Sequence, residues 1–184
     1  MWVSDEGTSL YTHDFYPLEL IAGEGTIEGW YLPIAVEVIR SLVWTNISWS
    51  NISTSIVNQS TCAIVDVVDR ESTRPQMFFK RGLGDHNYID AGAEVVIRNV
   101  DAHVFLRPTS NTATNIRAHR RDMEHLVEEV QRVVRQNRDN ASGYSFIKVD
   151  GIVPLDIEDD PRISPPYLET LIKVACRSVR EELS

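Results

Sequence analysis

Residues 115–137, NIRAHRRDMEHLVEEVQRVVRQN, decide the fold that this sequence predicts. Apolar side chains recur along it at Ile116, Met123, Leu126, Val127, Val130, Val133 and Val134. Charged side chains occupy positions between them, at Arg117, Arg121, Glu124, Glu128, Arg132 and Arg135. This period places the apolar residues on one side of an α-helix, which then needs a surface to cover it. Thr112, Thr114 and Asn115 each offer a side-chain oxygen where the helix could begin.

Candidate strands that could supply this surface lie on both sides of the helix. Before it, residues 93–106 alternate, with one face formed by Val96, Val100, Val104 and Leu106 and the other by Asn99, Asp101 and His103. After it, residues 144–150 and 152–157 predict two strands around Asp150-Gly151, a dipeptide common in turns and bulges. Residues 167–182 fit both a strand and a helix, and we favour a strand to about Ser178 with a short helical or frayed end.

The N-terminal quarter of the chain predicts an arm and a helix. Residues 1–25 carry scattered aromatic residues and glycines without a period, which indicates an irregular arm. Residues 29–46 have the helical period, and Pro33 is tolerated there because it falls in the first turn. The Asn- and Ser-rich stretch 46–53 indicates a loop or an edge strand.

Two apolar runs follow this helix. Residues 61–69 and 76–81 predict either a hairpin or two neighbouring strands, and residues 82–87 a glycine-containing loop. The whole pattern predicts an α+β fold in a single domain, residues 1–184, with the core at 26–184. In it a mainly antiparallel sheet is packed by two main helices.

Composition excludes some functional classes. The net charge of −9 disfavours an extended phosphate-binding surface and hence general nucleic-acid binding. The sequence contains no long apolar run and no basic, apolar leader, so we expect no membrane span and no signal peptide. Cys62 and Cys176 are the only cysteines, and we expect both to be buried in a reducing compartment. Fifteen arginines against three lysines are typical of either a high-salt or a high-GC source.

No catalytic or cofactor-binding motif is present. His119 and His125 are six residues apart on the predicted helix, which puts them on different sides and predicts no metal pair. Asp66 and Asp69 end a predicted strand, as a nuclease acid does, but none of the three lysines has an acid two positions before it. Phosphate loops, dinucleotide fingerprints and nucleophile elbows are also missing, so we expect no cofactor and no metal. Only residues that are far apart in the sequence could still form a catalytic site.

The order of the elements resembles that of the tail terminator proteins of tailed viruses. The resemblance covers roughly residues 30–180 and rests on a long strand running into the charged helix, followed by GYSFIKVDGIVPLDIEDDPRISPPYLETLIKVACRSVR at 143–180. In that segment Gly143-Tyr144 enters a strand, a proline-bearing connection follows, and Tyr167 starts the last strand. The N-terminal arm and the polar stretch 46–60 are longer than the compact family pattern, which leaves room for a different neck component. The arginine-rich acidity is similar to that of viruses infecting halophilic archaea.

The resemblance implies a structural protein of the virion, assembled in the host cytoplasm, and no enzyme. Tail terminators form a hexameric ring that caps the tail tube protein, stops its polymerisation and joins the connector or stopper at the head. Genomic DNA passes through such a ring without specific binding. Another neck or tail subunit, a generic α/β adaptor and a small enzyme without a motif remain as alternatives.

Two groups of residues are candidates for roles in a ring. The charged face of the long helix is a candidate subunit interface, since the arginines would meet the acidic surface of the next subunit: Arg117, Arg121, Arg132 and Arg135. One of these charges is expected to be satisfied within the helix, by an ion pair of Glu128 with Arg132. The acidic loop after residue 155 would repel DNA if it faced the channel, or add solubility if it faced outward: Asp156, Glu158, Asp159 and Asp160.

Overall fold

The central strand of the sheet is β4 (Ala93–Leu106), with the bounds that the alternating pattern predicts. It pairs along its whole length with the antiparallel strand β6 (Leu168–Glu181). The computed structural model describes residues 34–52, 54–90, 93–139, 141–155 and 165–181. The predicted arm, the first residues of the helix predicted at 29–46 and all four candidate acids of the loop lie outside these described residues.

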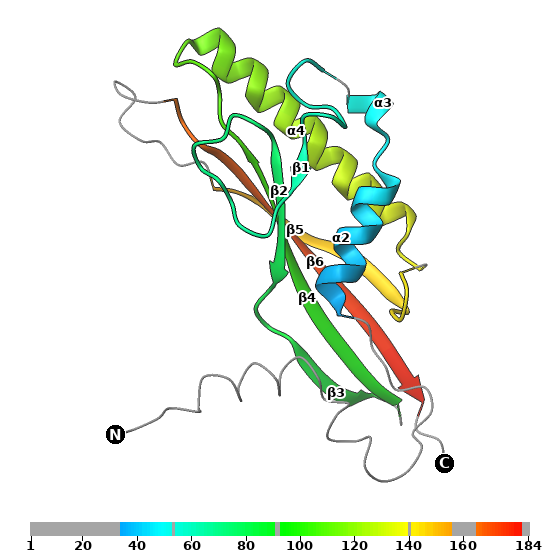
Figure 1. Cartoon of the computed structure of the whole chain (residues 1–184). Coiled ribbons are helices and arrows are strands. Elements are labelled where there is room, and N and C mark those ends of the chain that lie inside the picture. The colour runs from blue at the N-terminus through cyan, green and yellow to red at the C-terminus, as the bar shows by residue number, and fades with distance from the viewer. Residues whose placement is uncertain (1–33, 53, 91–92, 140, 156–164, 182–184) are drawn as a thin grey trace, which may run out of the picture. The chain divides into compact units, whose positions relative to one another are not determined.

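The strands of the described residues form one six-stranded sheet in the order β1-β2-β4-β6-β5, with β3 also paired to β4 (Figure 1). β2 (Gln76–Arg81) and β3 (His86–Asp90) lie end to end along the same edge of β4. Between them the chain turns at Gly84, whose φ of 88° favours glycine. β5 (Phe146–Pro154) pairs only with β6 among the described strands and so forms one edge of the sheet.

β1 (Ala63–Ile64) forms the opposite edge and is parallel to β2, whereas every other pairing is antiparallel. The prediction of a mainly antiparallel α+β fold is therefore confirmed. Of the two arrangements open for residues 61–69 and 76–81, the hairpin is wrong and the two neighbouring strands are right. Their parallel sense requires a connection longer than a hairpin turn, and residues 65–75 supply it.

Two helices pack on one face of the sheet, α2 (Ala35–Asn46) and α4 (Ala113–Gln136), and a short helix, α3 (Trp49–Ile52), follows α2 (Figure 1). The two main helices that the sequence predicts are thus present. The core lies between α4, α2 and the side chains that β4, β6 and β5 direct to this face. Its fully buried members include Ile39, Val43, Met77, Val100, Leu126, Val130, Ile147, Leu168 and Ile172.

The structure also corrects four other predictions about where strands, helices and loops begin and end. β5 is one strand and not two, because Asp150-Gly151 forms a register shift between Val149 and Gly151, which is a bulge and not a turn. β6 continues as strand to Glu181, so the helical end predicted after residue 178 is wrong. The stretch 46–53 contains α3 in place of a loop or edge strand. The loop predicted at 82–87 already includes the start of β3.

Candidate subunit interface

α4 carries the candidate interface and is fixed at its N-terminus by a side-chain cap. Thr112 accepts a hydrogen bond from the backbone N–H of Asn115 at 3.4 Å, so it is the cap among the three predicted candidates. The buried side of the helix has the predicted apolar residues from Met123 to Val134, but it also includes three polar side chains: His119, Asp122 and Glu129. These buried polar groups were not expected from the period, and two of them join α4 to the segment around α3.

Glu129 links α4 to the turn between α2 and α3. Its Oε1 accepts a hydrogen bond from the backbone N–H of Ser48 at 2.7 Å, and its Oε2 accepts one from Arg132 Nε at 2.8 Å. Arg132 also donates to the backbone carbonyl of Asn46 at 3.0 Å, across to the end of α2. The hydrogen bond from Arg132 lowers the pKa of Glu129, against the effect of burial, and the same bond raises the pKa of Arg132. The predicted partner Glu128 is exposed, so the ion pair within the helix is made at i, i+3 and not at i, i+4.

Asp122, two helical turns before Glu129, makes a second link between α4 and the segment after α3. Its Oδ2 accepts a hydrogen bond from Thr54 Oγ1 at 2.9 Å, and the same hydroxyl oxygen accepts from the N–H of Val57 at 2.9 Å. The carboxylate is 3% exposed, and its Oδ1 makes no hydrogen bond. Nε of Arg121 lies 3.7 Å from Oδ1 and screens part of this buried charge.

The four candidate arginines differ in what they contact. Arg132 is engaged within the chain, as described, which leaves its guanidinium less available to a neighbour. Arg117 and Arg121 are exposed on the outer side of α4. Arg135 is also exposed and donates to Gln131 Oε1 at 2.9 Å. Three of the four therefore form an arginine stripe on the solvent side of α4, defined by Arg117, Arg121 and Arg135.

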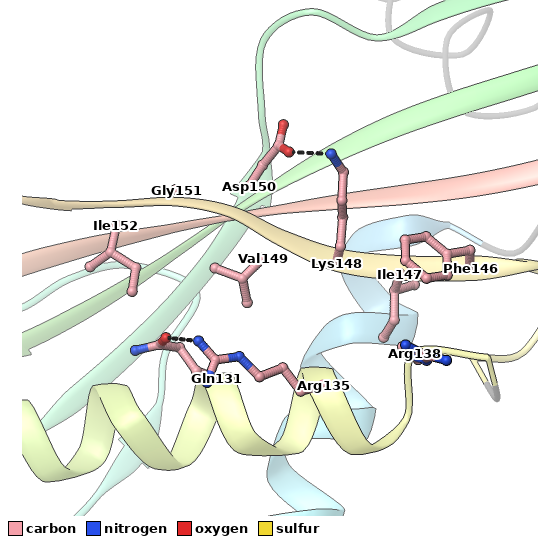
Figure 2. Close-up of a pocket in the computed structure, with 10 residues that line it drawn as sticks. All are labelled: Gln131, Arg135, Arg138, Phe146, Ile147, Lys148, Val149, Asp150, Gly151 and Ile152. Carbon is pink, nitrogen blue, oxygen red and sulfur yellow. Dashed lines mark hydrogen bonds and ion pairs between the residues drawn. The ribbon is translucent and has the colours of Figure 1, made fainter.

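A groove runs beside this stripe, between the C-terminal half of α4 and the edge strand β5 (Figure 2). It has a volume of about 540 Å³. Figure 2 shows Ile147, Val149 and Ile152 pointing from β5 toward α4, whereas Lys148 and Asp150 point to the other side, where they form an ion pair of 2.7 Å. β5 also contributes Phe146 and Gly151 to the lining, and the other lining residues, two of them basic, come from α4 and the loop after it: Gln131, Arg135 and Arg138. We call this the basic groove.

A second groove lies at the opposite edge of the sheet, between α2 and β1, and has a volume of about 500 Å³. Its lining comprises Glu37, Arg40, Ser41 and Trp44 from α2 and Cys62, Ala63 and Ile64 at the edge strand. Arg40 donates to Asp66 at 2.8 Å and lies 4.0 Å from Glu37, so two carboxylates surround one guanidinium here. We call this the acidic groove.

A third cluster lies on the sheet face that the helices leave uncovered, and the alternating pattern of β4 did not predict it. His103 on β4 is buried, and its Nδ1 lies 2.6 Å from Glu169 Oε1 on β6. Its ring stacks on Phe105 with an interplanar angle of 9°, and Phe105 in turn contacts Tyr167. Nε2 of His103 and the hydroxyl of Tyr167 are buried without a hydrogen-bond partner. Burial, followed by the charge of Glu169, raises the pKa of Tyr167.

The remaining candidates for chemistry are separated from one another. His119 is buried on α4, with Nδ1 2.8 Å from the carbonyl of Asn115, and His125 is exposed, so the two lie on different sides of the helix as predicted. Cys62 and Cys176 are both buried and free, and burial raises the pKa of each thiol to about 12. Within the part of the chain that the structure describes, no three His, Cys, Asp or Glu residues gather in a way that could hold a metal ion.

The chain was also compared with known proteins. No family model and no curated protein sequence matches it. Among the described residues, no helix combines the length and the apolar character that a membrane crossing requires.

Proposed function

We propose that this protein is a structural subunit of a virion, a tail terminator that assembles into a ring, caps the tail tube and joins it to the head-tail connector or stopper. The observation that carries the proposal is the edge strand β5, whose outer side, next to the basic groove, pairs with no other strand of the described residues. An edge strand is a template for pairing with another chain unless the protein blocks it. Among the described residues, two features interrupt this edge: the bulge at Asp150-Gly151 and the N–H of Ile147, which donates to the backbone carbonyl of Arg138 at 2.7 Å.

Charge supports self-assembly as the use of this edge. The arginine stripe and the basic groove stand on a chain of net charge −9. A neighbouring copy therefore offers mostly acidic surface, and contacts between the two signs favour a defined register. Contacts between two different surfaces of one subunit close into a ring when the rotation between neighbours closes, which prevents further growth by that contact.

A ring of this kind defines the other partners. Its two ends would contact the last ring of the tail tube and the connector, and genomic DNA would pass through the centre without specific binding. The acidic residues at 156–160 fit either of two positions, lining the channel, where they would repel DNA, or facing solvent. The arginine-rich, acidic composition supports a virus of a halophilic archaeal host as the source.

Another neck or tail subunit would share the open edge and the charge pattern, and its position in the virion distinguishes it. A generic α/β adaptor would bind through the same surface without forming a ring. An enzyme would need a pocket in which polar groups converge. The His103–Glu169 pair is the nearest approach to such a group, and it is buried beside aromatic rings.

The proposal is tested by size-exclusion chromatography with light scattering, with and without purified tail tube of the same virus. We expect a ring of about six copies, by the family resemblance, and electron micrographs in which it sits only at tube ends and stops tube growth. A protein that stays monomeric at all concentrations and never binds tube ends would contradict the proposal. A ring that binds elsewhere in the neck would favour the other virion subunits.

A further inference from the structure

The two edges of the sheet differ in a way that suits contact with each other. Among the described strands, β5 at one edge pairs only with β6 and β1 at the other edge pairs only with β2, although the N–H of Ile147 on β5 donates to the backbone carbonyl of Arg138. In both ladders the peptide groups of alternate residues point away from the paired strand. Each edge lies next to one of the two grooves, the basic groove beside β5 and the acidic groove beside β1.

The strand directions allow the two edges to pair. β5 and β4 are both antiparallel to β6, so they run the same way. β1 is parallel to β2, which is antiparallel to β4, so β1 runs the opposite way. When two copies stand side by side in the same orientation, β5 of one and β1 of the next are antiparallel. Antiparallel pairing is the more stable kind per residue.

The charges of the two grooves are complementary. Arg135 and Arg138 are exposed at the basic groove, and only Arg138 has a carboxylate beside it, Asp139 at 2.9 Å. Glu37 in the acidic groove and Asp66 beside it have side chains that are 62% and 81% exposed, while Arg40 between them is only 32% exposed. Arg74, the other cation near Cys62, donates to the backbone carbonyls of Ser60 and Thr61 at 3.3 Å. A partner therefore meets guanidinium groups at the β5 edge and carboxylates at the β1 edge. Guanidinium and carboxylate groups can form bidentate hydrogen-bonded pairs.

Apolar side chains are exposed at both edges as well. Ile152 on β5 is 40% exposed and lines the basic groove. Trp44 on α2 is 37% exposed, lines the acidic groove and packs edge-on against Trp49. The ring of Trp49 holds Trp44 in place, beside exposed charges. Aromatic residues such as Trp are enriched at the centres of protein interfaces.

We propose that the occupant of the basic groove is a second copy of this chain, which inserts its α2 and β1 edge so that Glu37 and Asp66 meet Arg135 and Arg138. This inference deepens the proposed function and rests on it, since it names the contact between neighbours in the ring. The contact joins two different surfaces of the subunit, so each copy uses both edges and a line of copies closes when the ring is complete.

A charge exchange between the edges tests this contact by light scattering. Arg135→Glu with Arg138→Glu makes the basic groove acidic, and Glu37→Lys with Asp66→Lys reverses the two exposed carboxylates at the acidic groove. Each pair alone places like charges together, and we expect it to weaken self-association by about tenfold or more. The protein with all four changes should assemble again, because every contact then joins opposite charges. Lys173→Glu, an exposed reversal on the sheet face without helices, is the control and should assemble like the wild type.

The outcomes separate this inference from the proposed function. If the wild type forms rings that cap tubes and both pairs of changes still assemble, the proposed contact is wrong and the function stands. If both pairs abolish assembly in folded protein and the combination does not restore it, the contact is also wrong. Loss caused by the basic-groove changes alone would indicate a symmetric contact of two β5 edges, or a different partner protein in the groove, and would overturn the inference.

Disulfide trapping provides a second measurement that does not depend on charge. Cys62 and Cys176 are buried, so an introduced thiol at Gln131 or Ser41 is the exposed one. Either single variant can form at most a covalent dimer, because each copy has one exposed thiol. Gln131→Cys combined with Ser41→Cys should give a ladder of oligomers longer than a dimer on mild oxidation. A combined variant that stops at dimers contradicts the proposed contact.

Discussion

The residues that depart most from the sequence pattern are His103 and Glu169. The alternation in β4 places His103 with Asn99 and Asp101 on a polar face, yet its side chain is buried. The reason lies in neighbouring strands, since Phe78 on β2 and Phe105 on β4 contact its ring and Glu169 on β6 reaches its Nδ1. The 2.6 Å contact joins Nδ1 of His103 to a carboxylate oxygen, so one shared proton lies between the two side chains. Periodicity along one strand gives no information about such contacts across three strands.

Removal of one member of this pair should cost more than removal of both. His103→Leu leaves the buried carboxylate of Glu169 without this donor, and we expect a loss of about 3 kcal/mol in the free energy of unfolding. His103→Leu with Glu169→Met replaces both groups by apolar ones, and we expect it to regain most of that loss. Urea unfolding followed by circular dichroism measures both values. A double variant that is less stable than the single one would contradict this expectation and would show that Glu169 stabilises the fold through contacts other than His103.

Glu129 gives a prediction about pH, because its pKa is lowered in the folded protein by the hydrogen bond from Arg132. A carboxylate with a lowered folded pKa adds stability above its unfolded pKa, and this contribution is lost as the pH falls through the folded pKa. Glu129→Gln should therefore lower the unfolding free energy at pH 7 by about 1.5–3 kcal/mol, the range for hydrogen bonds to charged groups. The difference from wild type should shrink as the pH falls into the acid range.

Thermal or urea unfolding between pH 7 and pH 3 measures this difference. Glu128→Gln is the matched control, since Glu128 is the adjacent acid on α4 and is exposed. Its effect should be small at every pH. A destabilisation by Glu129→Gln that is the same at all pH values would mean that the charge of Glu129 does not contribute, and that shape alone decides the effect.

At the level of the elements, the sequence predicted those whose pattern is long and local. β4 and α4 were placed within two residues at each end, because 14 and 24 residues carry a sustained period. β6 was found as a strand but ended too early, since its last residues are strand only by pairing with β4, where Val179 lies opposite Val95. The fold class followed from these three elements.

The short elements could not be predicted, because contacts elsewhere in the chain hold them. α3 has four residues, and the backbone N–H of Ser48 just before it donates to Glu129 on α4. β3 follows two glycines and exists by pairing with the first residues of β4. The two grooves likewise depend on which strands end the sheet, and the sheet order does not follow from the alternation in any single strand. The candidate site was predicted in part, as the arginine stripe, whereas the grooves beside it were not.

At the scale of the whole molecule, the exposed charges of α4 fit two uses, a solvated surface or an interface with a second copy. Arg117 and Arg121 lie on the outer side of α4, away from the core, so their loss leaves the packing of the helix unchanged. In a lone domain they would only be solvated. In a ring they would meet the acidic surface of a neighbour, in line with the basic groove at the other end of α4.

Arg117→Glu with Arg121→Gln tests this distinction. Glutamine is chosen at 121 because a glutamate there would stand next to the buried carboxylate of Asp122, whose Oδ1 lies 3.7 Å from Arg121 Nε. We expect an unfolding midpoint close to that of the wild type and a loss of rings by light scattering, since the change lowers by three the net charge of a surface that faces an acidic neighbour. Lys80→Gln with Lys173→Gln and Arg177→Gln makes the same change in net charge on the sheet face without helices, adds no carboxylate opposite Asp101, and should leave the rings intact. If both variants lose rings equally, net repulsion between copies explains the loss and the stripe is not an interface; if neither does, the stripe is a solvated face.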